Sequence, residues 1–577
     1  MSTALAVART PGVGTQNDTL ANMGTYLMFT LKRNWVRFVV WFVLVVGMLA
    51  FIATYYQGLF AGDAGAKELQ TFVQTVNSPA LLSMVGLITH PVSIAGATWC
   101  KAFMMSALML GIGIVFLMTR NLRADEDQGR AELVRAYPLG IHSRLAASVI
   151  LMSALSIVIG VFTALVMSSL NLCELNGQAM CANPGPSAWV FGLSLTGAGL
   201  VGVGIGALTN ELAPSSGSAN GMGTGLFGLF YLMRIIGDVQ TTWTPGVSAD
   251  GFQTMTPSGW GQWLTWVSPI GWSQKMDPWG ANLVWPLLLS VAFTAVLVAL
   301  AWALQSRRDL GDSIAPERTG KANASRTLTT VWGLGARLQR GSLIGWFIGV
   351  FVFAAVFGSV TTAMHDLLTS ANLAGIDNLH LTTNLLSVVA NLFMPLLALV
   401  VSIFAAQSAT MMRSDESRGV LESQLGTSVG RTSWVLQRLA VTFVAVLILL
   451  FICGLALGST FDSLVPDANQ MWPIIGSFYA YVPACMIVAG IFVLGFGWWP
   501  RFSVAVTWIV IGALWVIMIV GLAVPIPKAV LDAMPFNATP KVPYDAMNWP
   551  PVLWLTLVTV VFIVLGLVGF RRRNVPA

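Results

Sequence analysis

Residues 123–140 read RADEDQGRAELVRAYPLG, and residues 413–430 read RSDESRGVLESQLGTSVG. Both stretches are polar and charged, yet each lies between long apolar runs. Their alignment places identical residues at one constant offset: Arg123/Arg413, Asp125/Asp415, Glu126/Glu416, Gly129/Gly419, Glu132/Glu422 and Gly140/Gly430. A membrane composition repeats Leu, Val and Ala, but it does not repeat charges and glycines in register. We therefore predict a duplicated chain in which a polar segment outside the lipid forms a docking surface.

The composition is that of an integral membrane protein. Hydrophobic residues make up 56% of the 577 residues and charged residues 9%, whereas soluble domains carry about 25% charged residues. Twelve apolar runs are each close to the ~20 residues that a helix needs to cross a bilayer. They are 35–55, 102–118, 145–170, 188–208, 218–236, 282–304, 343–360, 386–406, 436–457, 474–496, 502–522 and 552–570. The prediction is an all-α polytopic membrane protein of about twelve transmembrane helices, built as two fused six-helix pseudo-repeats, 1–310 and 311–577.

Each half is predicted to begin with an interfacial helix and to contain a re-entrant outer segment. Apolar residues at helical spacing in 17–34 favour a helix that lies in the membrane interface, and 328–340 is similar. Residues 240–281 are rich in Trp, which favours the membrane–water boundary, so we expect short helices there that dip back to the outer interface. The matching place in the second half is 524–549. The Trp-rich segment is open to two interpretations, interfacial anchoring or contact with a transported substrate.

The basic residues indicate the orientation. If the first span runs from inside to outside, outer positions carry only a few of the 30 Lys and Arg residues: Lys67, Lys101, Arg234, Lys275, Lys528 and Lys541. The positive-inside rule then places both polar segments and both termini in the cytoplasm.

Other polar residues suggest local structure rather than catalysis. Arg234 and Asp238 are spaced to pair one helical turn apart, either as a structural ion pair in the membrane or as a ligand contact. Cys173 and Cys181 flank a short outer loop on the oxidising side, so we predict a disulfide between them, with two free thiols as the alternative. The five cysteines include no C-x-x-C pair or Cys/His cluster, so no metal site is predicted. No G-x-x-x-x-G-K-[ST] phosphate loop is present, so the chain is not expected to hold ATP by itself.

Three motifs carry a resemblance to a known family. They are E-x-x-G-R-x-E-L at 126–133 with a weaker copy at 416–422, Leu-Met-Arg at 232–234, and SPIGW at 268–272. With the twelve spans, the chain resembles the permease subunit of type V (ABC-2-like) ABC exporters. More narrowly it resembles the actinobacterial polyketide-antibiotic (tetronasin-type) exporter permeases, in which both halves are fused. In the second copy Val420 and Ser423 replace the motif's Arg and Leu.

The resemblance implies that each polar segment is a coupling helix that docks on a separate ATPase subunit. The residues assigned to this coupling are Asp125, Glu126, Gly129, Arg130, Glu132 and Leu133, with Asp415, Glu416, Gly419 and Glu422 in the second copy. We expect Asp125 and Glu126 to favour the helix N-terminus, Glu126 to pair with Arg130, and the two glycines to permit close backbone approach.

The same resemblance implies an assembly in the bacterial cytoplasmic membrane. Two copies of an ABC ATPase subunit would bind ATP and Mg, and this chain would hold no cofactor and would not itself be an enzyme. The cargo would be an amphipathic drug, antibiotic or lipid moved out of the cell through the bilayer, with no nucleic-acid partner.

Two other classes stay open. An ion-coupled secondary multidrug transporter would also have twelve spans and two repeats, but it needs ionisable groups near the bilayer midplane. A polytopic lipid-linked transferase would need clustered acids or histidines, and the four histidines are scattered.

Overall fold

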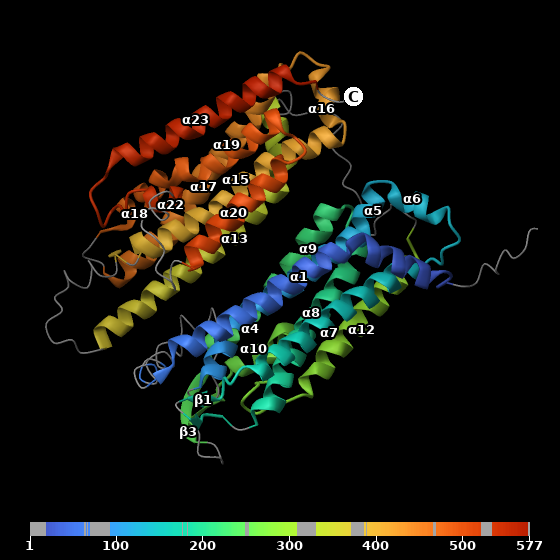
Figure 1. The fold of residues 1–577 in the computed structure, drawn as a ribbon, viewed down its shortest axis with the longest axis vertical. Coiled ribbons are helices and arrows are strands. Elements are labelled where there is room, and N and C mark those ends of the chain that lie inside the picture. The colour runs from blue at the N-terminus through green and yellow to red at the C-terminus, as the bar shows by residue number, and fades with distance from the viewer. Residues whose placement is uncertain are drawn as a thin grey trace, which may run out of the picture. The chain divides into compact units, whose positions relative to one another are not determined.

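The computed structural model shows a chain made almost entirely of long helices (Figure 1). It describes residues 19–62, 65, 67, 69, 93–175, 177–181, 183–247, 253–308, 331–370, 386–387, 389–465, 469–520 and 534–574. Within these ranges ten helical segments are long and apolar enough to cross a membrane. The prediction of an all-α polytopic membrane protein is confirmed.

The chain divides into two compact units, Met1–Thr319 and Gly320–Ala577. The predicted boundary, 310/311, lies outside the described residues. In the first unit the elements are α1 (Met23–Leu59), α4 (Ile94–Asn121), α5 (Arg123–Asp127), α6 (Arg130–Arg135), α7 (Ser143–Ser169), β1 (Glu174–Leu175), β2 (Gln178–Ala179), α8 (Pro184–Leu212), α9 (Ser216–Val239), β3 (Thr242–Val247), β4 (Gln253–Ser258), α10 (Gly261–Val267), α11 (Pro269–Gln274) and α12 (Pro286–Gln305).

The second unit has a similar order of elements. They are α13 (Val331–Ser370), the π-helix η2 (Val389–Phe393), α15 (Met394–Ser417), α16 (Val420–Leu425), α17 (Arg431–Leu464), α18 (Met471–Phe478), the 3-10 helix η4 (Tyr479–Tyr481), α19 (Val482–Trp498), α20 (Ser503–Val520), α22 (Pro535–Ala538) and α23 (Trp549–Arg572). In both units a short helix, α6 or α16, follows the second long helix.

The twelve predicted spans fall on the ten membrane-spanning segments and on α9 and α20. Helix α9 is 24 residues long but begins SGSANGMGTG, and this Ser- and Gly-rich start lowers its hydropathy. In α20 the apolar stretch covers Ser503–Trp515, which is shorter than the other candidate spans. The number twelve therefore stays a prediction.

Helix α8 is the core of the first unit. In its apolar window 89% of the residues are buried. It contacts α4, α7 and α12, which run beside it in Figure 1, and also α9 and α11. Glycines make the α7–α8 crossing close: a Cβ on Gly160 would overlap Thr196 and Gly192, and a Cβ on Gly192 would overlap Gly160. Membrane helices commonly approach each other through such small residues. In the second unit α19 contacts α15, α17, α20 and α23.

Each unit begins with a helix longer than its predicted span. Helix α1 is continuous over 37 residues, about 55 Å at 1.5 Å per residue, so it is longer than the ~30 Å hydrocarbon core. The predicted helix at 17–34 is therefore joined to the first span without a break from Met23 on, and its place in the membrane interface stays a prediction. Likewise α13 runs unbroken from Val331 to Ser370.

The Trp-rich segment contains a hairpin that was not predicted. Strands β3 and β4 pair antiparallel ahead of the short helices α10 and α11. Thr242 pairs with Ser258 across the hairpin, and their hydroxyls lie 2.8 Å apart, which is the kind of cross-strand contact that stabilises a two-stranded sheet. In the second unit 521–533 lie outside the described residues, and α22 begins with Pro535 as α11 begins with Pro269.

Candidate functional site

A glycine in the left-handed conformation begins each short polar helix. Gly129 has φ 68° and precedes α6, and Gly419 has φ 73° and precedes α16. A Cβ at either position would meet no atom within 4 Å. Glycine is favoured at both positions because a side chain disfavours positive φ. The close approach of a partner's backbone to these glycines stays a prediction. The turn separates α6 and α16 from the long helices before them.

Glu126 lies in a buried ion cluster and not on the surface. Its side chain is 5% exposed, and its carboxylate lies 3.0 Å from Arg123, 3.3 Å from Arg144 and 3.0 Å from Arg308. Arg308 follows α12, and it also lies 3.0 Å from Glu211 at the end of α8. One carboxylate thus joins α5 to the beginning of α7 and to the ends of α8 and α12.

The predicted pair between Glu126 and Arg130 is wrong. Arg130 pairs with Asp125 at 2.8 Å instead, and Arg33 of α1 pairs with the other oxygen of Asp125, also at 2.8 Å. The reason is the left-handed turn at Gly129, because i,i+4 neighbours face each other only along one continuous helix. Asp125 is itself buried.

The second unit repeats this arrangement with fewer partners. Glu416, with a side chain 2% exposed, lies 2.7 Å from Arg413 and 2.7 Å from Arg573, which follows α23. Asp415 pairs with Arg438 of α17 at 2.6 Å. In both units, therefore, the Glu of the polar segment meets an arginine that follows the unit's last helix. Arg573 also lies over the rings of Phe496 and Phe570. In the first unit, Arg308 has the carboxylate of Glu211 beside it instead.

The exposed residues of the polar segments are on α6 and α16. Ala131 and Leu421 face inward and are buried, whereas Glu132 and Glu422 are exposed. Leu133 is 77% exposed, an unusual degree for a leucine on a short helix. Of the predicted coupling residues, Asp125, Glu126 and Glu416 are thus buried supports, Asp415 is half-buried, and the others lie on the surface.

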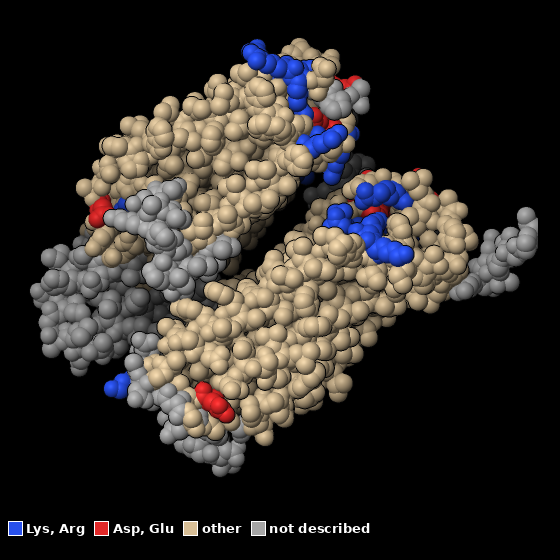
Figure 2. Space-filling view, viewed as in Figure 1, with Lys and Arg blue, Asp and Glu red and all other residues tan. Residues whose placement is uncertain are grey.

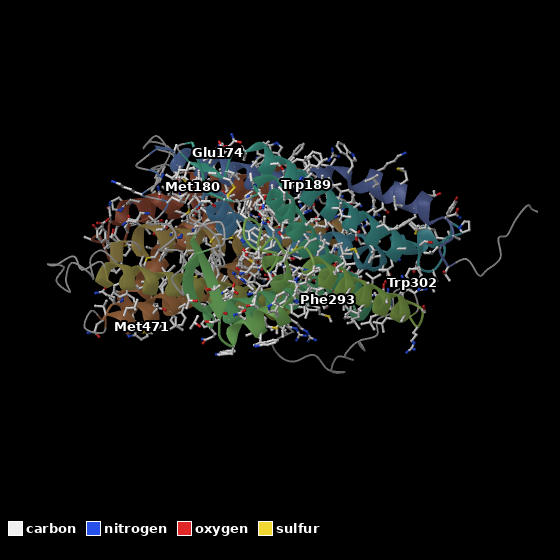
Figure 3. All side chains as sticks on the ribbon, turned by 90° about the horizontal axis from the view of Figure 1, so that it is seen from below. Glu174, Met180, Trp189, Phe293, Trp302 and Met471 are labelled. Atoms are coloured by element: carbon white, nitrogen blue, oxygen red, sulfur yellow. A yellow bond between two sulfur atoms is a disulfide. The ribbon has the colours of Figure 1, made fainter. Side chains whose placement is uncertain are left out.

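His142 fixes the end of α12 against the start of α7. Its ring stacks on Trp302, labelled in Figure 3, at 4.2 Å between ring centres. Its Nδ1 lies 2.8 Å from Oε1 of Gln305. The sequence analysis did not predict this contact of His142, nor the ion pairs of Arg308 and Arg573. From the sequence alone these side chains were only a scattered histidine and basic residues at the cytoplasmic boundary.

Arg234 and Asp238 form an ion pair of 2.9 Å at the other end of the first unit. Both are buried, at 0% and 1% exposure. Gln274 of α11 bridges them, since its Oε1 accepts from Arg234 Nε and its Nε2 donates to Asp238. Thr265 of α10 donates to the second Asp238 oxygen. These contacts favour the structural interpretation, in which the pair holds α10 and α11 against α9.

Breaking this pair is expected to be costly. Arg234→Met leaves Asp238 buried without its counter-charge, and such a loss typically destabilises by about 3–5 kcal/mol. Lys275 is also near Asp238, and burial lowers the pKa of its ammonium group. The double variant Arg234→Met/Asp238→Leu removes both charges and should regain most of the loss. Thermal unfolding in detergent measures the stability of the single and the double variant. An Arg234→Met variant as stable as the wild type would refute the structural role of the ion pair.

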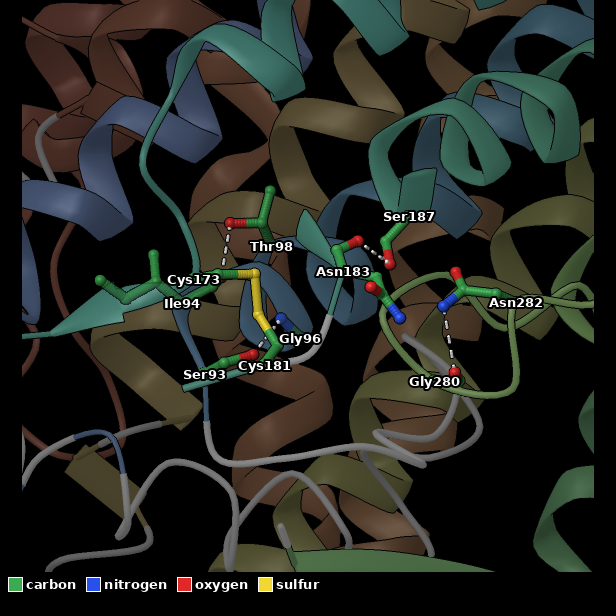
Figure 4. The surroundings of a disulfide bond; sticks show 10 residues. All are labelled: Ser93, Ile94, Gly96, Thr98, Cys173, Cys181, Asn183, Ser187, Gly280 and Asn282. Atoms are coloured by element: carbon green, nitrogen blue, oxygen red, sulfur yellow. Dashed lines mark hydrogen bonds between the residues drawn. A yellow bond between two sulfur atoms is a disulfide. The ribbon is translucent and has the colours of Figure 1, made fainter. Parts of the chain in front are cut away.

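Cys173 and Cys181 are joined by a disulfide across the β1–β2 hairpin, with 5.3 Å between their Cα atoms (Figure 4). The hairpin follows α7, so it lies at the opposite end of that helix from α5 and α6. Ala95 of α4 donates its backbone N–H to Leu172 and ties the hairpin to the helix bundle. Within the described ranges no group of three or more His, Cys, Asp or Glu side chains could hold a metal ion.

Comparison with known proteins finds similarity to efflux permeases. Residues 328–571 match the family model described as the C-terminal domain of the multidrug efflux system permease Rv1217c. The chain is also 28% identical over 557 residues to the multidrug efflux system permease protein Rv1217c of Mycobacterium tuberculosis (strain ATCC 25618 / H37Rv), covering 95% of this chain and 94% of that protein. These names describe a transport protein and not an enzyme, which agrees with the prediction.

Proposed function

We propose that this chain is the membrane-spanning subunit of an ATP-driven ABC exporter and that α6 and α16 bind two copies of a separate ATPase subunit. The observation that carries the proposal is the repeated construction of the polar segments. Each unit presents a short exposed helix after a left-handed glycine, and each connects it through a buried Glu and Arg to the unit's last long helix. The full-length similarity to an efflux permease supports the same class.

The buried ion cluster suits the transmission of movement. A partner that displaces α6 displaces α5, and Glu126 passes this to Arg144 of α7 and to Arg308 after α12. Asp127 accepts a hydrogen bond of 2.7 Å from the backbone of Ser216, so the start of α9 follows as well. Several spans thus move together when one surface helix is pushed, as packed elements with fixed contacts do.

The orientation proposed from the basic residues agrees with the contacts. The α5–α6 end of the first unit collects most of its Arg side chains, whereas the disulfide lies at the opposite end. Cytoplasmic loops carry the excess of Lys and Arg, and disulfides persist on the oxidising side. We therefore place α6, α16 and both termini in the cytoplasm of a bacterial cell, with the chain in its cytoplasmic membrane.

ATP and Mg belong to the proposed partner, and the cargo class is an amphipathic drug, antibiotic or lipid. The relative's name includes multidrug efflux, and apolar exposed surface such as that of α1 and α12 suits movement along lipid. An ion-coupled transporter is the second candidate. Among the described residues, however, every buried charged side chain lies within about two turns of a helix end, as Glu211, Arg234 and Arg438 illustrate. Midplane ionisable groups, on which ion coupling depends, are not found in those ranges.

The test is ATP hydrolysis by purified components. The chain alone is expected to hydrolyse no ATP above a detergent blank, because it has no phosphate loop. Added ATPase subunit should form a complex whose turnover rises with an amphipathic drug. An ATPase subunit with its phosphate-loop lysine replaced is the control and should bind without turnover. Hydrolysis by the chain alone, free of contaminating ATPase, would refute the assignment.

A further inference from the structure

Four arginines lie close together where α1, α4 and α6 of the first unit meet, and two of them pair with one carboxylate. They are Arg33 and Arg37 of α1, Arg120 in the last turn of α4, and Arg130 of α6, and the carboxylate is Asp125. Figure 2 shows the blue Lys and Arg side chains collected at this end of the unit. We call the three arginines Arg33, Arg37 and Arg120 the basic cluster.

Asp125 does not neutralise the cluster. One of its oxygens pairs with Arg33 and the other with Arg130, so both are occupied. Arg37 donates to the neutral amide of Asn34 at 2.9 Å. Arg120 is exposed and has no hydrogen bond or ion pair to any other described residue. Arg37, Arg33 and Arg130 repel it, and Asp125 alone attracts it. About three positive charges therefore remain unmatched within one small surface.

The second unit shows that this excess charge is not needed to build a polar segment. At the repeat positions of Arg120 and Arg130 it has Thr410 and Val420. Its Asp415 is matched by the single Arg438, and the turn at Gly419 still forms as it does at Gly129. The basic cluster therefore has a role of its own in the first unit.

The cluster lies where the lipid-facing surface of α1 begins. Trp35 is 59% and Val36 54% exposed, and Val39, Val40 and Val43 continue the apolar stripe along the helix. Arg33 lies over the ring of Phe29, at 5.5 Å from its centre. Aromatic residues mark the headgroup level of a bilayer, and long basic side chains place their charged ends there. An anion bound here would sit beside acyl chains.

We propose that the basic cluster binds the phosphate of an anionic phospholipid in the cytoplasmic leaflet, with the acyl chains of the lipid along the apolar stripe of α1. Three guanidinium groups from two helices supply donors that fit phosphate oxygens. The lipid would hold α1 and α4 together beside the Asp125–Arg130 pair that supports α6. The assignment of the lipid to the cytoplasmic leaflet rests on the proposed function. The anion-binding site itself rests only on the contacts and charges of the basic cluster.

The test is lipid binding to the purified full chain, measured by native mass spectrometry during titration with phosphatidylglycerol or phosphatidylcholine. The wild type is expected to prefer phosphatidylglycerol. The variant Arg37→Gln/Arg120→Thr should lose about 30-fold in affinity for it, since each basic residue near a membrane surface contributes about 1 kcal/mol. The variant should fold, because within the described residues Arg120 has no hydrogen bond or ion pair to lose and its removal relieves repulsion from three neighbouring arginines. Arg337→Gln/Arg340→Gln, which removes two exposed charges from α13 of the second unit, is the matched control and should keep the preference.

Each other outcome overturns the proposal. Displacement of the lipid by millimolar inorganic phosphate or glycerol phosphate would assign the cluster to a free anion. Equal losses in the control would mean general charge attraction, and unchanged binding in the Arg37/Arg120 variant would place the lipid elsewhere. The binding assay contains no ATPase, so it stands or falls independently of ATP-driven transport.

Discussion

Glu126→Ala is expected to destabilise the first unit by about 3–5 kcal/mol, because it removes the carboxylate that three buried arginines share and leaves Arg144 without its ion-pair partner. Arg123, Arg144 and Arg308 all lie within 3.3 Å of the Glu126 carboxylate, and all have side chains at most 8% exposed. The expected result is poor accumulation in the membrane and a large drop in the unfolding temperature in detergent, with loss of export as a consequence.

The second unit offers a matched control for this variant. Glu416→Ala removes the equivalent carboxylate, but Arg413 is 29% exposed and can be hydrated once its partner is gone. Its loss of stability should therefore be smaller. Adding Arg144→Met to Glu126→Ala removes the buried arginine whose ion pair is with Glu126 and should recover part of the loss. If Glu126→Ala unfolds like the wild type, the cluster does not hold the polar segment in place.

Glu132→Ala is expected to abolish export while leaving folding unchanged. Glu132 is exposed on α6, where a solvated carboxylate contributes little to stability. If it pairs with a basic residue of the ATPase, its removal leaves that charge unmatched at a desolvated contact, which costs roughly 2–5 kcal/mol of binding. Leu133→Asp should have a similar effect, since a leucine 77% exposed in the free chain is available for an apolar contact with the partner.

The measurement is the affinity of the ATPase subunit for the detergent-solubilised chain, with transport followed in parallel. Glu422→Ala should weaken association less, because α16 has Val420 where α6 has Arg130. Glu174→Ala, an exposed carboxylate on β1 at the opposite end of α7, should change nothing. Wild-type association and export in both Glu132→Ala and Glu422→Ala would mean that the repeat is kept for a reason other than docking.

The repeat in the sequence predicted where the polar segments lie but not which of their residues face outward. Asp and Glu in a charged stretch are usually solvated, so Asp125 and Glu126 were grouped with Glu132. The burial of Glu126 depends on Arg308, which is 182 positions away in the chain, and that of Asp125 on Arg33, which is 92 positions away. Sequence spacing does not reveal such a distant contact. Arg130 pairs with Asp125 and not with Glu126 because Gly129 has a positive φ. A prediction that assumes one regular helix through this segment does not include that turn.

The apolar runs predicted the helices themselves well, because lipid requires long apolar segments whatever their packing. Boundaries near the interface were harder to predict. Helix α1 extends far beyond the apolar run 35–55, since its earlier residues are buried at Tyr26, Thr30 and Asn34 on one face. Strands β3 and β4 consist of Thr, Pro, Gly and other residues that suit an interfacial loop equally well, so composition alone did not distinguish a hairpin from short helices.

The most direct test of ATP-driven export is transport of an amphipathic fluorescent drug into inside-out vesicles that contain the chain with its ATPase partner. We expect uptake that requires both ATP and the ATPase, that persists when ionophores collapse the proton and sodium gradients, and that disappears with Glu132→Ala. Uptake driven by an ion gradient in vesicles that contain the chain alone, without ATP, would contradict the proposed function and assign the chain to the ion-coupled transporters.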